Sequence, residues 1–233
     1  MSYCVVIPAA GSGTRMGAAV PKVLLKPAVD QAREGLSILA QTVRVFSDDA
    51  ECASIVVCAP AEWRGSFASE LSGLPGVVII EGGASRQASV WRGVEELERR
   101  GVLQPDSVVL VHDAARCCLT REVIERVLDG VQCHGAVTAA VPVVDSLCRA
   151  EDGRVVGYVD RSQAWAIQTP QGFFAEDLLR AHREAAQQGI EALDDAALVA
   201  RIRPVHVVHG DRFNIKVTQP GDLAVAERIG ASG

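Results

Sequence analysis

The sequence is poor in several features that mark whole classes of protein. Aromatic residues make up only 4% of its 233 residues, so the core must rely mainly on Val, Leu, Ile and Ala within an apolar content of 48%. No stretch approaches the ~18 apolar residues of a membrane-spanning helix. No lysine or arginine precedes Arg15, which argues against a signal peptide. We therefore predict a single domain over residues 1–233 with no membrane partner.

Basic charge is also scarce, and the cysteines follow no metal-binding or disulfide pattern. The formal net charge is −6, which argues against a nucleic-acid partner but leaves room for a local basic pocket. Cysteine occurs seven times, an odd number, and never with C-x-x-C spacing. This usage argues against a disulfide framework or a zinc site and favours a cytoplasmic location.

Short β-branched runs alternate along the chain with amphipathic stretches. The runs typical of strands cover 3–7, 54–59, 76–80, 107–113 and 136–143, and the helical stretches cover 85–100, 120–132 and 175–188. Several strand runs are apolar on both faces, as expected for parallel strands covered by helices. We predict an α/β fold with a doubly wound, mostly parallel sheet.

One segment breaks this alternation. Two extended runs, 145–150 and 154–160, are joined by Glu-Asp-Gly, and Asp-Gly between extended runs predicts a β-hairpin. An isolated two-stranded hairpin is only marginally stable. We expect an arm at about 143–163 that packs on a second subunit, which would make the protein a homodimer. The alternative is a hairpin folded onto its own domain.

A glycine-rich turn, PAAGSGTRMG, directly follows the first apolar run. The phosphate loop of the Walker type requires a Gly-Lys pair, which the sequence lacks. The dinucleotide fingerprint fits at Gly11 and Gly13, but its third glycine is replaced by Met16. Both of these phosphate-binding templates are therefore disfavoured.

A third template fits better: a strand, then G-x-G-x-R-M, then Pro-Lys. Gly11 and Gly13 would let backbone N–H groups surround phosphates. Arg15 and Lys22 would bring two positive charges to the same place. Such a pair suits a reaction in which negative charge grows on the bound phosphate. The alternative is a tight turn with two solvated basic side chains.

Asp113 ends the apolar run 107–113. A carboxylate at the carboxyl end of a central parallel strand lies at the ligand crevice of such folds. It could bind Mg²⁺, which favours carboxylate and phosphate oxygens, or hold a substrate hydroxyl. It could also cap a helix beginning at Ala114. The neighbouring His112 is interpreted as a packing residue.

Ordered blocks across residues 3–223 extend this pattern. They read PAAGSGTRMG, PKVLL, EGGASRQASV, VHDAAR, VDR, QTPQGF and NIKVT. Together they resemble the 2-C-methyl-D-erythritol 4-phosphate cytidylyltransferase family of nucleotidyltransferases. The resemblance implies that the phosphate of methylerythritol phosphate attacks the α-phosphorus of CTP with the help of Mg²⁺. The products would be CDP-methylerythritol and pyrophosphate.

The resemblance also implies a role for individual residues. The catalytic cations would be Arg15, Lys22 and Lys216. The nucleotide would be bound by Ala9, Ala10, Gly11, Gly13, Gly82, Gly83 and Ser89. The polyol phosphate would be bound by Asp113, Arg116, Ser146 and Arg161. Asp113 is also the candidate metal ligand, Arg86 would hold the second glycine loop or touch substrate, and Arg161 would act in the neighbouring subunit's site.

The sequence departs from the family pattern at three places. Cys117 follows Arg116 where proline is common, and Ser146 replaces threonine but keeps the hydroxyl. Leu193 stands where the family has a threonine that contacts the substrate phosphate, and leucine cannot donate a hydrogen bond. Leu193 therefore leaves open a cytidylyltransferase for another polyol phosphate, such as ribitol 5-phosphate.

Two further classes of protein fit the residues less well than an enzyme of this family. A short-chain nicotinamide reductase would need Tyr-x-x-x-Lys, but Tyr3 and Tyr158 are followed four residues later by Ile7 and Ser162. A non-catalytic nucleotide sensor would have no need of the full set of cations and the carboxylate. The retention of that set argues against it.

Overall fold

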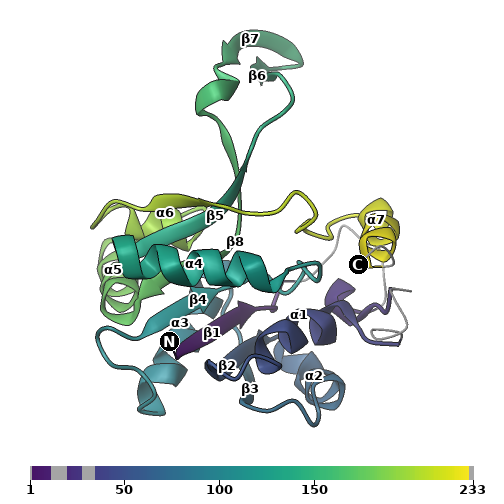
Figure 1. The fold of residues 1–233 in the computed structure, drawn as a ribbon, viewed down its shortest axis with the longest axis vertical. Helices are drawn as coiled ribbons and strands as arrows, with labels where there is room; N and C mark the ends of the chain where they lie inside the picture. The colour runs from purple at the N-terminus through teal and green to yellow at the C-terminus, as the bar shows by residue number, and fades with distance from the viewer. Residues whose placement is uncertain (1, 12–19, 28–34, 231–233) are drawn as a thin grey trace.

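One central sheet organises the chain. The computed structural model describes residues 2–11, 20–27 and 35–230 (Figure 1). Within them, seven strands form this sheet in the order β3-β2-β1-β4-β8-β5-β9. The strands are β1 (Tyr3–Pro8), β2 (Cys52–Ala59), β3 (Val77–Glu81), β4 (Val108–Val111), β5 (Ala136–Pro142), β8 (Trp165–Phe174) and β9 (His206–His209). Only β8 is antiparallel to its neighbours, so the predicted mostly parallel sheet is confirmed.

Helices cover both faces of the sheet. They are α1 (Ile38–Ser47), α2 (Arg64–Glu70), α3 (Arg86–Arg99), α4 (Arg121–His134), α5 (Ala175–Gln188), α6 (Asp195–Val199) and α7 (Pro220–Gly230). Successive strand residues point to opposite faces. Val5 therefore packs in one core with Phe46 of α1 and Val127 of α4, whereas Val6 packs in the other core with Val94 of α3. Among these helices, none has the length and apolar content to cross a bilayer.

The three predicted helices form close to their expected limits. Ser85 caps α3 by accepting a hydrogen bond from the Ala88 amide at 3.1 Å, which supplies an acceptor for one unpaired N–H of the first turn. Helix α4 runs two residues beyond its predicted end, to His134. It stops at Gly135, whose φ of 80° is accessible to glycine without steric cost. Helix α5 matches its predicted range.

The arm is confirmed as a hairpin that projects from the body. It consists of β6 (Leu147–Glu151) and β7 (Arg154–Val159), which form a separate two-stranded sheet. Asp152 and Gly153 both have positive φ, as a tight hairpin turn of this hand requires. The arm leaves the body between β5 and β8 and extends away from it (Figure 1). The alternative of a hairpin folded onto its own body is therefore wrong.

Candidate active site

A pocket of about 530 Å³ opens where the chain leaves β1 and β4. These adjacent parallel strands are followed by connections that run in different directions, which is where ligands bind in open α/β sheets. Its lining comes from five separate segments of the chain. The lining residues are Pro8, Ala9, Ala10, Gly11, Lys22, Val23, Gly83, Ala84, Ser85, Arg86, Ser89, Asp113, Ala114, Ala115, Lys216 and Thr218.

One wall of the pocket is backbone. Ala9, Ala10 and Gly11 follow β1, and the second glycine loop faces them. The two loops approach closely, because a Cβ added to Gly82 would lie 2.4 Å from the Cβ of Ala10. Ser89 on α3 fixes the second loop by accepting a hydrogen bond from the Gly83 amide at 3.0 Å. The sequence-predicted nucleotide residues in this part of the chain are therefore brought together, with Gly82 just behind the lining.

Two lysines from distant parts of the sequence reach the same pocket. Lys22 lies on the short 3-10 helix η2 (Lys22–Leu24), and its Nζ donates to the Val217 carbonyl at 2.8 Å. Lys216 is adjacent to that carbonyl, and its segment is tied to the body by the Val217 amide, which donates to the Ala115 carbonyl at 2.9 Å. The bond from Lys22 thus joins the two cation-bearing segments directly.

Asp113 is the acidic centre of the site. Its Oδ2 lies 2.8 Å from Nζ of Lys216, and its Oδ1 lies 3.2 Å from Nε of Arg86. Burial alone would raise the pKa of this carboxyl, but the charges of Arg86 and Lys216 hold it well below its usual value. Asp113 caps no helix: residues 114–119 are not helical, and α4 begins at Arg121. The helix-cap alternative is therefore wrong.

His112 and Arg116 support the site from behind. His112 is fully buried between the Thr169 hydroxyl and the Arg116 carbonyl, and burial lowers its pKa to about 4. It therefore stays neutral at pH 7, in agreement with its interpretation as a packing residue. Arg116 Nη1 donates to the Asn214 carbonyl at 2.6 Å, and its Nε lies 3.7 Å from Asp113. Arg116 thus braces the segment that carries Lys216 and is not one of the pocket's lining residues.

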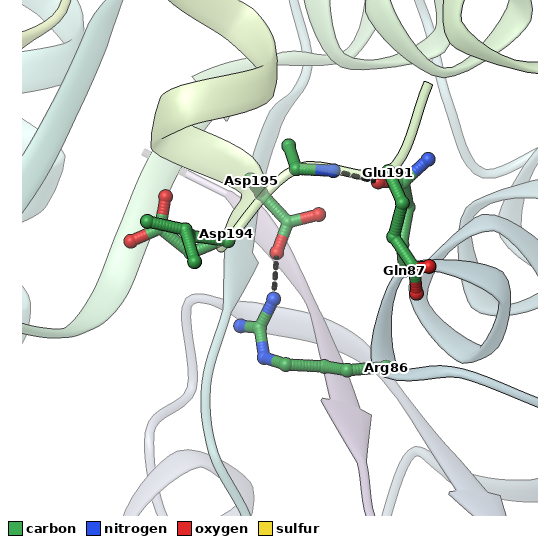
Figure 2. A pocket seen from close by; sticks show the side chains of 7 residues that line it. Arg86, Gln87, Glu191, Asp194 and Asp195 are labelled. Atoms are coloured by element: carbon green, nitrogen blue, oxygen red, sulfur yellow. Dashed lines mark hydrogen bonds and ion pairs between the residues drawn. The ribbon is translucent and has the colours of Figure 1, made fainter. Parts of the chain in front are cut away.

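Arg86 connects this pocket to a second one. The second pocket, of about 410 Å³, is lined by Arg86, Gln87, Glu191, Ala192, Leu193, Asp194 and Asp195 (Figure 2). Arg86 Nη1 donates to Asp195 Oδ2 at 2.6 Å, while its Nε contacts Asp113. Sequence reasoning singled out the Leu193–Ala196 block only for Leu193, which is 95% exposed. It missed Asp195, although an acidic pair next to a predicted substrate contact was the available signal.

The remaining predicted residues lie elsewhere. Ser146 and Arg161 belong to the arm and are exposed. Arg161 donates to the Val144 carbonyl at 2.9 Å, within the arm's own base. Within one chain, neither lines the pocket. Gly13 and Arg15 lie outside the described residues.

The donor set of the pocket suits a hard cation held largely by a substrate. Among the described residues, no group of three or more His, Cys, Asp or Glu side chains could hold a metal ion. Asp113 is the single carboxylate in the described lining of the pocket. Mg²⁺ commonly binds through one or two carboxylates together with substrate phosphates and water. One carboxylate in a pocket that also holds Lys22 and Lys216 fits that pattern.

Comparisons with known proteins agree with this arrangement. The profile of the 2-C-methyl-D-erythritol 4-phosphate cytidylyltransferase family matches residues 3–231. Proteins of that name from Bacillus velezensis and Bacillus mycoides are 39% and 42% identical, over 98% and 97% of this chain and 96% of each relative. The crystal structure of the Thermus thermophilus enzyme of that name superposes with a TM-score of 0.79 at 38% identity, covering 99% of both chains. This chain therefore belongs to the 2-C-methyl-D-erythritol 4-phosphate cytidylyltransferase family.

Proposed function

We propose that this chain transfers the cytidylyl group of CTP to 2-C-methyl-D-erythritol 4-phosphate, a step in isoprenoid precursor synthesis. The acceptor phosphate forms a bond to the α-phosphorus, and pyrophosphate leaves. The observation that carries this proposal is the meeting of Lys22, Lys216 and Asp113 in one pocket beside the glycine-rich turn, in a chain of this family.

The two lysines would reduce the electrostatic repulsion between the acceptor phosphate and the phosphates of CTP, which opposes this reaction. Each pair of like unit charges at 4 Å costs roughly 4 kcal/mol at an effective dielectric near 20. Lys22, together with Arg15, would offset this repulsion at the α-phosphate and the leaving pyrophosphate, and Lys216 would face the pentacoordinate α-phosphorus. Lys216 is oriented in advance by its ion pair with Asp113. Arg15 is proposed as a third cation.

The two glycine loops would hold the nucleotide. Backbone N–H groups of Ala9, Ala10, Gly11 and Gly13 would surround the phosphates. Gly82, Gly83 and Ser89 would bind cytosine and ribose. The close approach of Gly82 to Ala10 supports a slot narrow enough to exclude purines.

Mg²⁺ is the proposed cofactor, with Asp113 as its protein ligand and phosphate oxygens as the others. Its chemistry there would be to neutralise phosphate charge. Both oxygens of Asp113 already have cationic partners. Each oxygen can accept a further hydrogen bond, so the second proposed role of Asp113, holding a substrate hydroxyl, also stays open. Removing divalent metal with a chelator should abolish pyrophosphate release, and added Mg²⁺ should restore it.

A homodimer formed through the arm would complete the acceptor site. Arg116, Ser146 and Arg161 are the proposed ligands of methylerythritol phosphate, with Arg161 acting in the partner's site. The exposed apolar residues of the arm, Val155, Val156 and Tyr158, support this proposal, because a hairpin with such a surface gains stability when it is covered.

The decisive test of the reaction is pyrophosphate release by the purified chain with methylerythritol phosphate and each of CTP, ATP, UTP and GTP. We expect rapid release with CTP and little with the others. Ribitol 5-phosphate should replace the acceptor poorly, because the relatives carry the methylerythritol phosphate name. Equal rates with ATP, or faster turnover of ribitol 5-phosphate, would contradict the proposal. The low basic charge and the cysteine usage support a cytoplasmic enzyme without a nucleic-acid partner.

A further inference from the structure

A line of hydrogen-bonded polar side chains runs from helix α5 to the pocket. His182 places Nε2 3.1 Å from Oδ1 of Asp195. Oδ2 of Asp195 accepts from Nη1 of Arg86 at 2.6 Å, and Nε of Arg86 donates to Oδ1 of Asp113 at 3.2 Å. Asp195 and His182 are 1% and 3% exposed, so solvent competes little for these contacts.

The two neighbouring aspartates do different things. Asp194 caps α6, where it accepts a hydrogen bond from the Ala197 amide at 2.7 Å, and it also accepts from Gln171. Figure 2 shows Asp195 pointing toward Arg86 and Asp194 turned away. Since Asp194 already caps α6, Asp195 is not needed for that purpose. Its carboxylate serves only the contacts to His182 and Arg86 that the structure describes.

Asp195 is held as an anion. Burial would raise its pKa, but the hydrogen bond from His182 and the charge of Arg86 outweigh burial and lower it. An ionised carboxylate only accepts hydrogen bonds, so Nε2 of His182 carries the proton between them. The imidazole is itself fixed by stacking on Trp91, with ring centroids 5.7 Å apart and planes at 22°.

Two carboxylates therefore share the fork of one guanidinium. Arg86 gives Nη1 to Asp195 and Nε to Asp113, while its buried Nη2 has no hydrogen-bond partner among the described residues. The bond to Asp195 thus holds the guanidinium where only Nε reaches Asp113. The second oxygen of Asp113 is then available to Lys216. Without Asp195, the guanidinium of Arg86 could turn and present Nε and Nη2 together to both oxygens of Asp113, as arginine commonly does with a lone carboxylate. Lys216 would then lose its partner.

We propose that Asp195, oriented by His182, is a positioning residue that acts through Arg86 to keep Asp113 paired with Lys216. This inference rests on the proposed function for its effect on turnover, but the pairing of Lys216 can be measured without turnover. Neither Asp195 nor His182 lies in the nucleotide pocket, so the effect belongs in kcat and not in the KM for CTP.

The first test is a double-mutant cycle on the full chain. Asp195→Asn should lower kcat at least ~10-fold and change the KM for CTP less than ~3-fold. In an Arg86→Met background the same change should lower kcat less than ~3-fold, because Asp195 can then no longer act through Arg86. The matched control is Asp49→Asn, which alters a buried carboxylate bonded to Tyr3 and Arg121. It should lower the melting temperature and leave kcat within ~2-fold.

A second pair of variants keeps the test decisive if Asp195→Asn does not fold. His182→Gln retains an N–H donor, whereas His182→Phe retains a ring over Trp91 and loses the donor. We expect His182→Phe to lower kcat ~5-fold or more and His182→Gln to stay within ~2-fold of the parent. Equal values in the two variants, or an Asp195→Asn loss that persists in the Arg86→Met background, would overturn the proposal.

The readout that does not depend on turnover is the reactivity of the Lys216 amine, whose side chain is 41% exposed. Acetylation followed by mass spectrometry should be at least ~3-fold faster at Lys216 in Asp195→Asn than in the parent, and unchanged in Asp49→Asn, because an amine released from its 2.8 Å contact with Asp113 is more open to the reagent. An unchanged rate would overturn the proposal. Failure of the parent to consume CTP would overturn only the proposed function.

Discussion

In the central sheet Val5, Val6 and Val56 are fully buried, whereas Val156 and Tyr158 of the arm are 48% and 79% exposed. In the body, helices on both faces of the sheet cover the apolar residues. The arm has the same kind of residues, and no part of the chain that the structure describes covers them. The body therefore builds the pocket from its own packed core, while the proposed dimer would give the arm the cover that a two-stranded hairpin with exposed apolar residues lacks.

The largest expected effect comes from the body's lysines. Lys22→Ala and Lys216→Ala should each lower kcat at least ~100-fold, by analogy with the loss of one charge-stabilising donor. Pyrophosphate release at saturating CTP measures this loss. Near-parental rates in either variant would remove that lysine from the mechanism.

The arm should show a smaller effect that depends on assembly. Val156→Asp combined with Tyr158→Asp puts two charges on the exposed apolar surface of β7, and we expect a monomer with at least ~10-fold lower activity. Light scattering and turnover measure the two outcomes. Val207→Asp is the matched control, because it charges an exposed valine of the body. A fully active monomer would contradict the role of the arm.

Mixing two inactive variants sharpens this comparison. Lys216→Ala damages the body site and Arg161→Ala damages the arm. In a dimer that exchanges arms, each mixed pair keeps one site with neither change, so an equal mixture should recover about a quarter of parental activity. No recovery after exchange of subunits would show that each chain uses its own arm.

We expect a tenfold effect on nucleotide binding when the two facing loops of the pocket, at Ala10 and Gly82, are forced apart. Gly82→Ala would place a methyl group 2.4 Å from Ala10 Cβ and 3.0 Å from the Ser89 hydroxyl. The loops must separate, so the KM for CTP should rise ~10-fold with kcat less affected. Adding Ala10→Gly removes the closer contact and should recover part of the loss. A normal KM in the single variant would argue against a tight slot.

The smallest effect is on stability at high pH. Burial raises the pKa of the Cys58 thiol to about 12. The unfolded chain loses this proton near pH 9 and the folded chain does not. The contribution of Cys58 to stability is therefore fully present below pH 9 and is lost as the pH rises toward 12. The cost should be about 1–2 kcal/mol at pH 10. Cys58→Ser should remove that part of the decline in thermal melts, and Cys148→Ser, on the exposed arm, should not.

The sequence predicted what depends on local pattern. Amphipathic spacing located α3 and α5, and Asp-Gly located the arm. Cys4 and Cys58 are buried in the core, whereas Cys133 and Cys148 are exposed, and no local pattern separates the two kinds. Strand β8 was not predicted, because Gln168 and Gln171 interrupt its apolar run. They are buried only because distant groups, such as the Asp211 and Ala196 backbones, pair with them.

The residues of the candidate site divide in the same way, into those that local pattern predicts and those that depend on distant partners. Asp113 could be predicted, since the end of an apolar strand fixes where the carboxylate lies. The line from Asp113 through Arg86 to Asp195 could not, because it joins three elements that are distant in sequence. Which of Asp194 and Asp195 turns inward depends on where α6 begins, and the residue pattern does not set that point.

The most direct measurement of the central claim is the fate of the α-phosphorus of CTP, followed by ³¹P NMR with methylerythritol phosphate present. The account predicts that every CTP consumed yields one diphosphate diester, CDP-methylerythritol, and one pyrophosphate, with no CTP consumed when the acceptor is left out. Formation of CDP and inorganic phosphate, or consumption of CTP without the acceptor, would contradict it.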